Sequence, residues 1–157
     1  MRSRDMVDFQ KSNSYVYFAL QGDDFDPEEI SKALDINPSD SYRKNENGKY
    51  PSPPFRKHTL WKWSTEKGKE PILIDNLVTE VIDKFKGKEY IINELKAKFN
   101  LWSVLEIVLY IDINEEISTP ALGHDLETIE FLYKTQTVTD VDIYRYNSLK
   151  EKNTKHF

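Results

Sequence analysis

The sequence of 157 residues contains no cysteine, which excludes a disulfide framework, a thiol nucleophile and a zinc site built on thiolates. It has five glycines and no glycine-rich phosphate loop, H-E-x-x-H motif or dinucleotide fingerprint. No apolar run approaches the roughly 20 residues that span a bilayer. The first ten residues also lack a hydrophobic signal core. We therefore expect a cytoplasmic protein without a membrane partner.

The composition is ordinary for a globular protein, with 38% hydrophobic, 13% aromatic and 31% charged residues. A chain of this length can bury one substantial core, and it is too short for two comfortable domains. We expect a single α+β domain over residues 14–146. Residues 1–13 and 147–157 are polar and are expected to form flexible ends.

The net charge of −5 is distributed unevenly along the chain. Residues 40–69 carry a net charge of +5, whereas residues 101–142 carry −8, with Lys134 as the only base. The two regions could neutralise each other within the fold or remain solvated. Alternatively, the second region forms an acidic surface for a basic partner.

The most apolar stretch, residues 101–113, predicts a strand that is paired on both edges and covered by helices on one face. Its apolar residues recur at period two, as in a strand. The apolar face consists of Leu101, Leu105, Ile107, Leu109, Ile111 and Ile113. The other face mixes Trp102, Val104 and Val108 with Glu106, Tyr110 and Asp112.

The rest of the chain predicts three further strands and four helices. Strands are expected at residues 14–21, 57–65 and 138–146, from their alternation and β-branched or aromatic content. Helices are expected after the caps Asp26 and Asp125 and over residues 71–85 and 88–99, with Gly87 between the last two. The helix after Asp125 is predicted to carry Leu126, Ile129, Leu132 and Tyr133 on or near its buried side.

These elements predict a two-layer α+β sandwich. We expect a sheet of about four strands, helices mainly on one face and a ferredoxin-like βαβ–αα–βαβ order. Residues 38–57, which are rich in proline and asparagine, are expected to form a long irregular loop.

Five segments together resemble a known bacterial family, domain of unknown function 4279. They are YFALQGDDFDPEEISKALDINPS, LWKWST, VLEIVLYIDI, TPALGHDLETIEFL and VDIYRY, spread over residues 14–146. The chain departs from the family pattern at Asp35, where a glycine commonly follows the first helix, and at Gly123-His124 in the P-A-L turn. The motifs mark strands, turns and helix starts, so the resemblance implies a fold and supplies no active site.

No catalytic residue, metal or cofactor is predicted. The groups Asp23, Asp24 and Asp26, and Asp140 with Asp142, could ligate a hard cation, but helix capping and solvation explain them equally well. A Ser/His/Asp triad would require a geometry that the sequence does not show. The acidic total also disfavours nucleic acid as a partner, although aromatic and basic residues alternate between residues 42 and 63.

Our leading hypothesis is a non-enzymatic cytosolic domain that binds a protein with a basic surface, of the kind that inhibits a toxin or nuclease. A merely solvated sheet face is the structural alternative to this site. The residues predicted to bind the partner are Glu106, Tyr110, Asp112, Asp140, Asp142 and Tyr144.

The rival hypothesis is a small-molecule or nucleotide binder, with or without enzymatic activity. It would use the loop at residues 38–57 and the strand that carries two tryptophans, although such a pair more often anchors a core edge. The residues predicted for this alternative ligand site are Arg43, Lys44, Arg56, Lys57, Trp61 and Trp63.

Overall fold

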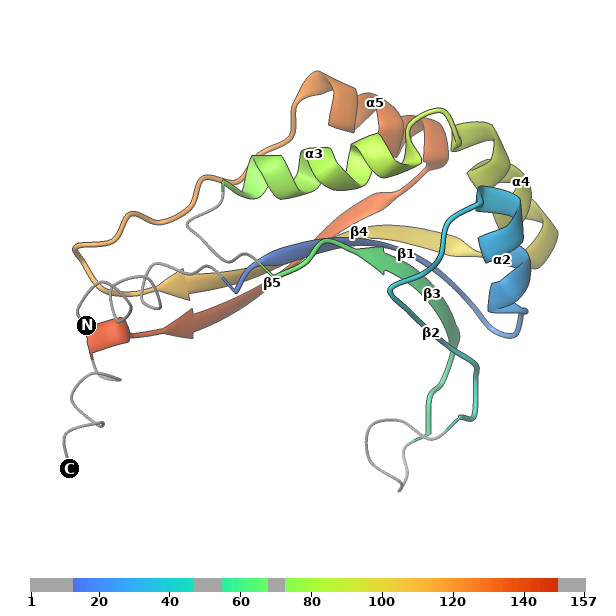
Figure 1. The fold of residues 1–157 in the computed structure, drawn as a ribbon, viewed down its shortest axis with the longest axis horizontal. Coiled ribbons are helices and arrows are strands. Elements are labelled where there is room, and N and C mark those ends of the chain that lie inside the picture. The colour runs from blue at the N-terminus through green and yellow to red at the C-terminus, as the bar shows by residue number, and fades with distance from the viewer. Residues whose placement is uncertain (1–12, 47–54, 68–72, 150–157) are drawn as a thin grey trace.

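The computed structural model describes residues 13–46, 55–67 and 73–149. Most of the expected flexible ends, and residues 47–54 of the expected loop, lie outside these ranges. Within them, helices cover one face of a curved sheet (Figure 1). The strands are β1 (Tyr15–Gly22), β2 (Asp40–Tyr42), β3 (Thr59–Ser64), β4 (Trp102–Asp112) and β5 (Val138–Tyr146). The helices are α2 (Pro27–Leu34), α3 (Ile74–Phe85), α4 (Glu89–Phe99) and α5 (Leu126–Thr135).

The sheet is mixed and has the strand order β2-β3-β1-β4-β5. All neighbouring pairs are antiparallel except β4 and β5, which run parallel and are joined through α5. The α+β prediction is therefore confirmed, and the sheet has five strands where about four were expected. The additional strand, β2, has three residues and lies inside the stretch that we expected to be an irregular loop. Such a short strand has too few alternating positions to be seen in the sequence.

The capping residues explain where two of the helices begin. Asp26 accepts a hydrogen bond from the backbone N–H of Glu28 at 3.0 Å, and Asp125 accepts one from Thr128 at 2.8 Å. Each bond satisfies a donor that the first helical turn leaves free, and it lowers the pKa of the capping carboxyl. At the other end of α2, Asp35 adopts a left-handed conformation with φ of 53°, a region that favours glycine.

The core lies between the sheet and the helices. β1 contributes Phe18, whose ring packs 4.5 Å from that of Phe85 on α3, and β4 contributes Leu105, Ile107 and Leu109. All four of these side chains are at least 97% buried in the fold. Most of the predicted apolar face of β4 is thus the core face, but Ile113 lies beyond the end of the strand and is 44% exposed. β4 pairs with β1 on one side and β5 on the other, although β1 occupies the middle of the sheet.

The predicted buried side of α5 is wrong. Leu126, Ile129 and Tyr133 are 83%, 48% and 76% exposed, and only Leu132 of the predicted set packs against the core. The buried positions are instead Thr128, Phe131 and Thr135. Thr135 can be buried because its hydroxyl donates to the carbonyl of Phe131 at 2.8 Å.

Candidate functional site

The face of the sheet that carries no helix gathers the acidic residues of β4 and β5. Helices lie on the opposite side (Figure 1), where the odd-numbered residues of β4 enter the core. The even-numbered residues, including Glu106 and Tyr110, therefore point away from the helices. The parallel register places Glu106 beside Asp140, Val108 beside Asp142 and Tyr110 beside Tyr144. We call this side the helix-free face.

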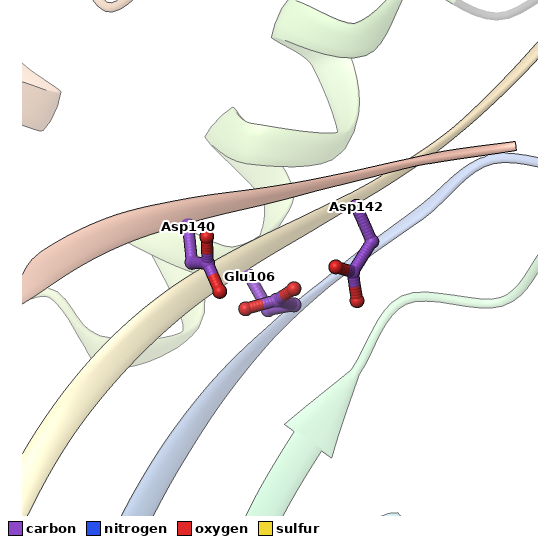
Figure 2. Close-up of side chains that lie close together, drawn as sticks. All are labelled: Glu106, Asp140 and Asp142. Atoms are coloured by element: carbon purple, nitrogen blue, oxygen red, sulfur yellow. The ribbon is translucent and has the colours of Figure 1, made fainter.

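Three carboxyl groups converge on the helix-free face. Glu106, Asp140 and Asp142 each place a carboxylate oxygen within 4.8 Å of the others, and we call this group the acid cluster (Figure 2). Glu106 is 5% exposed, whereas the two aspartates are exposed to solvent. In the described part of the chain, no lysine, arginine or histidine forms an ion pair with the cluster. The cluster therefore concentrates negative charge around one buried carboxyl.

Burial and the two neighbouring acids raise the pKa of Glu106 to about 7. Burial contributes most, because a charge removed from water is poorly stabilised. A hydrogen bond to the side chain of Asp142 and repulsion from both aspartates add to the shift. The cluster consequently holds a proton near neutral pH, when isolated glutamic acids are ionised.

Tyrosine rings surround the acid cluster on neighbouring strands. On β1, Tyr17 is the register partner of Glu106, and its ring stacks on that of Tyr15 with centroids 6.3 Å apart. On β4 and β5, the rings of Tyr110 and Tyr144 stack at 5.0 Å with an interplanar angle of 19°. Burial, followed by the charge of Glu106, raises the pKa of Tyr17 above its ordinary value, so this phenol stays neutral.

Sequence reasoning missed Tyr15 and Tyr17 as members of this face. Their signal was available, since both alternate along β1 with the core residues Val16 and Phe18. The register between β1 and β4, which brings Tyr17 beside Glu106, depends on how distant segments pair.

Asp112, the remaining residue of the predicted partner site, is buried and hydrogen-bonded to the backbone. It is 7% exposed, and its Oδ1 accepts hydrogen bonds from the backbone N–H groups of Asn114 and Ser148 at 3.1 and 3.2 Å. These bonds hold the turn after β4 against the segment after β5. A partner therefore has less access to Asp112 than to Asp140 or Asp142.

Three of the four basic residues of the alternative ligand site are engaged with the protein itself. Arg43 pairs with Asp26 at 3.0 Å, and Lys44 pairs with Asp23 at 2.6 Å. The guanidinium of Arg56 lies 3.5 Å from the centroid of the Tyr42 ring. Two of the three aspartates that could have formed a metal site near residue 23, Asp23 and Asp26, thus have cationic partners.

The two tryptophans of β3 lie on the core side of the sheet. Trp61 is fully buried, and its indole N–H donates to the hydroxyl of Ser31 at 3.0 Å. Trp63 is half-buried, packs against Phe85 and has the ammonium of Lys84 5.4 Å from its ring centroid. The structure therefore does not combine the tryptophans with Arg43, Lys44, Arg56 and Lys57 into one site.

A cavity of about 290 Å³ lies between α3 and the start of α5. Asp75, Thr79 and His124 are among the residues that line it. The Nε2 of His124 hydrogen-bonds Thr139 at 2.9 Å, while its Nδ1 is buried without a partner among the described residues. This cavity is separated from the acid cluster by the sheet.

The chain belongs to the family described as "Domain of unknown function (DUF4279)", which it matches over residues 12–146. The resemblance seen in the sequence is therefore confirmed. No curated protein and no solved structure gives a significant match. None of the helices in the described ranges has the length and apolar character that a bilayer crossing requires.

Proposed function

We propose that this chain is a non-enzymatic protein-binding domain whose helix-free face binds a partner with a basic surface. The observation that carries the proposal is the acid cluster, which is set among four tyrosine rings on a sheet face without covering helices. Aromatic rings supply contact area at interfaces, and clustered carboxylates attract and orient a positively charged surface. A toxin or nuclease that binds nucleic acid has a basic surface, so its inhibitor would need this complementarity. The absence of cysteine from the chain suits the cytoplasm.

Affinity capture from the native host with charge-reversed variants tests the proposal. The variant Asp140→Lys/Asp142→Lys should lose a stoichiometric protein partner that the unmodified protein retains. Both positions are exposed, and the new ammonium groups would give Glu106 cationic neighbours, so the fold should survive. The matched control is Glu80→Lys/Asp83→Lys, which makes the same charge change on exposed positions of α3, across the sheet.

Two outcomes would contradict the proposal. One is a partner that the Asp140→Lys/Asp142→Lys variant binds as well as the unmodified protein does. The other is the recovery of a small ligand with no protein partner. Circular dichroism and gel filtration on each variant would establish that it is folded.

We also propose that the fold is a ferredoxin-like unit with one added strand. The support is that the chain from β1 to β4 follows a β-α-β-β-α-β order, with two helices in the second crossover. Its four strands are antiparallel in the order β2-β3-β1-β4. On this proposal, α5 and β5 are an extension, and the extension supplies two of the three acids of the cluster.

A further inference from the structure

We propose that the acid cluster is the anchor for an arginine side chain of the partner. The inference rests on the proposed function, because it names the chemistry by which the helix-free face would recognise a basic protein.

The geometry of the cluster suits a guanidinium group. Carboxylate oxygens from Glu106, Asp140 and Asp142 lie within 4.8 Å of one another and come from two adjacent strands (Figure 2). A guanidinium carries five N–H donors in a rigid planar fork, so it can bind two carboxylates at once. Ionised carboxylates supply acceptors only, which leaves the cluster without a donor except for its proton.

The burial of Glu106 is the observation that calls for a cation. Its side chain is 5% exposed and lies between Tyr17 on β1 and Asp140 on β5 in the sheet register. Within the described ranges, no basic side chain forms an ion pair with it. A buried charge without a partner is strongly unfavourable, so the isolated protein keeps a proton there. A cation from a partner would remove the need for that proton.

The tyrosine rings favour arginine over other cations. Rings on this face already carry cations of the chain itself: the ammonium of Lys62 lies 4.6 Å from the Tyr17 centroid, and Arg56 lies over Tyr42. The stacked pair of Tyr110 and Tyr144 presents a further aromatic surface beside the cluster. A planar guanidinium stacks on such rings while its edge binds carboxylates, which neither an ammonium nor a metal ion can do as well.

Binding of an arginine should depend on pH through Glu106. The groups that face this carboxyl are Asp140 and Asp142 on β5 and Tyr17 and Tyr15 on β1, with Lys62 over the Tyr17 ring and Lys67 over the Tyr15 ring. Arginine stays charged throughout the neutral range, as do lysines. With the pKa of Glu106 at about 7, only the ionised form would bind, and affinity should rise about tenfold between pH 6 and pH 8.

The experiment is a titration of the ¹⁵N-labelled full chain with hexa-arginine peptide at pH 6 and pH 8 in physiological salt. We expect amide shifts centred on residues 106 and 140–142, and affinity about tenfold higher at pH 8. Glu106→Gln, which mimics the protonated acid and cannot ionise, should bind at pH 8 at least as weakly as the unmodified protein binds at pH 6. Glu130→Gln, the same chemical change on an exposed residue of α5, should behave like the unmodified protein.

Parallel titrations with hexa-lysine, MgCl₂ and CaCl₂ complete the test. The inference is overturned if hexa-lysine binds as tightly as hexa-arginine, if the peptide shifts lie elsewhere, or if Glu106→Gln leaves affinity unchanged. It is also overturned if millimolar Mg²⁺ or Ca²⁺ moves the same amides while the peptide does not, since the cluster would then be a metal site. If the captured partner is still lost in Asp140→Lys/Asp142→Lys, the proposed function stands without this anchor. If the partner is retained, both fail.

Discussion

Glu106 on β4 and Asp140 on β5 are direct partners in a parallel ladder, so two acidic side chains lie next to each other on the helix-free face. Like charges at such positions destabilise a sheet. Asp142 adds a third carboxyl within 4.8 Å, and the glutamate is buried. A fold that only needed to be stable would gain from a neutral residue at position 106.

We therefore expect Glu106→Gln to change how stability depends on pH. The pKa of Glu106 is about 7 in the folded protein and near 4.5 in the unfolded chain, so the folded state holds the proton more tightly. Stability of the unmodified protein should thus fall by about 2 kcal/mol between pH 5.5 and pH 8 relative to the variant. Urea denaturation of both proteins across this range measures the difference, and parallel pH profiles would show that Glu106 titrates normally.

Leu109→Ala should destabilise the fold by roughly 2 to 5 kcal/mol, because it removes a side chain that is 3% exposed in the core. Chemical denaturation measures this loss. The matched control is Leu149→Ala, the same truncation at a position 49% exposed, which should change stability by less than about 0.5 kcal/mol. A loss below about 1 kcal/mol for Leu109→Ala would contradict the assignment of this strand face to the core.

On α5, Phe131→Ala should cost roughly 3 to 5 kcal/mol, while Leu126→Ala should cost less than about 0.5 kcal/mol. Phe131 is 3% exposed, and its ring packs 6.0 Å from that of Phe18, whereas Leu126 is 83% exposed. Thermal or urea unfolding of the two variants decides between the two faces of the helix. The reverse ranking would restore the orientation that the sequence suggested.

The sequence predicted which residues share a face more successfully than it predicted which residues meet. Alternation along β4 and β5 correctly grouped Glu106 with Tyr110 and Asp140 with Tyr144, because side-chain direction follows from strand geometry alone. The pairing of Glu106 with Asp140 and with Tyr17 required the register between separate strands, which depends on the whole fold.

On α5, periodicity failed for a different reason. The helix carries apolar residues on more than one side, and the core selected the side of Phe131 with the two threonines Thr128 and Thr135. The hydrogen bond from Thr135 to the Phe131 carbonyl makes a polar residue compatible with burial. Hydrophobicity alone could not reveal this compensation.

Asp125→Ala should destabilise the protein by about 1 kcal/mol, because it removes the acceptor for the Thr128 N–H at the start of α5. Asp83→Ala, an exposed position on α3, is the matched control and should have little effect. Asp125→Asn should retain most of the stability, since an amide oxygen can also cap. Equal losses for the alanine and asparagine variants would indicate that the cap is not the source of the effect.

The position of β1 in the middle of the sheet constrains the order in which the protein can be completed during synthesis. Among the described strands β1 is made first, yet its two neighbours are β3, at residues 59–64, and β4, at residues 102–112. The hydrogen-bonding edge of β1 that pairs with β4 therefore stays unpaired until a segment more than 80 residues later has been made. Such delayed, non-local pairing slows folding and leaves aggregation-prone hydrophobic surface and strand edges exposed in nascent chains. The growing polypeptide thus passes through a stage in which its most central strand is half-paired, and this stage ends only when β4 emerges.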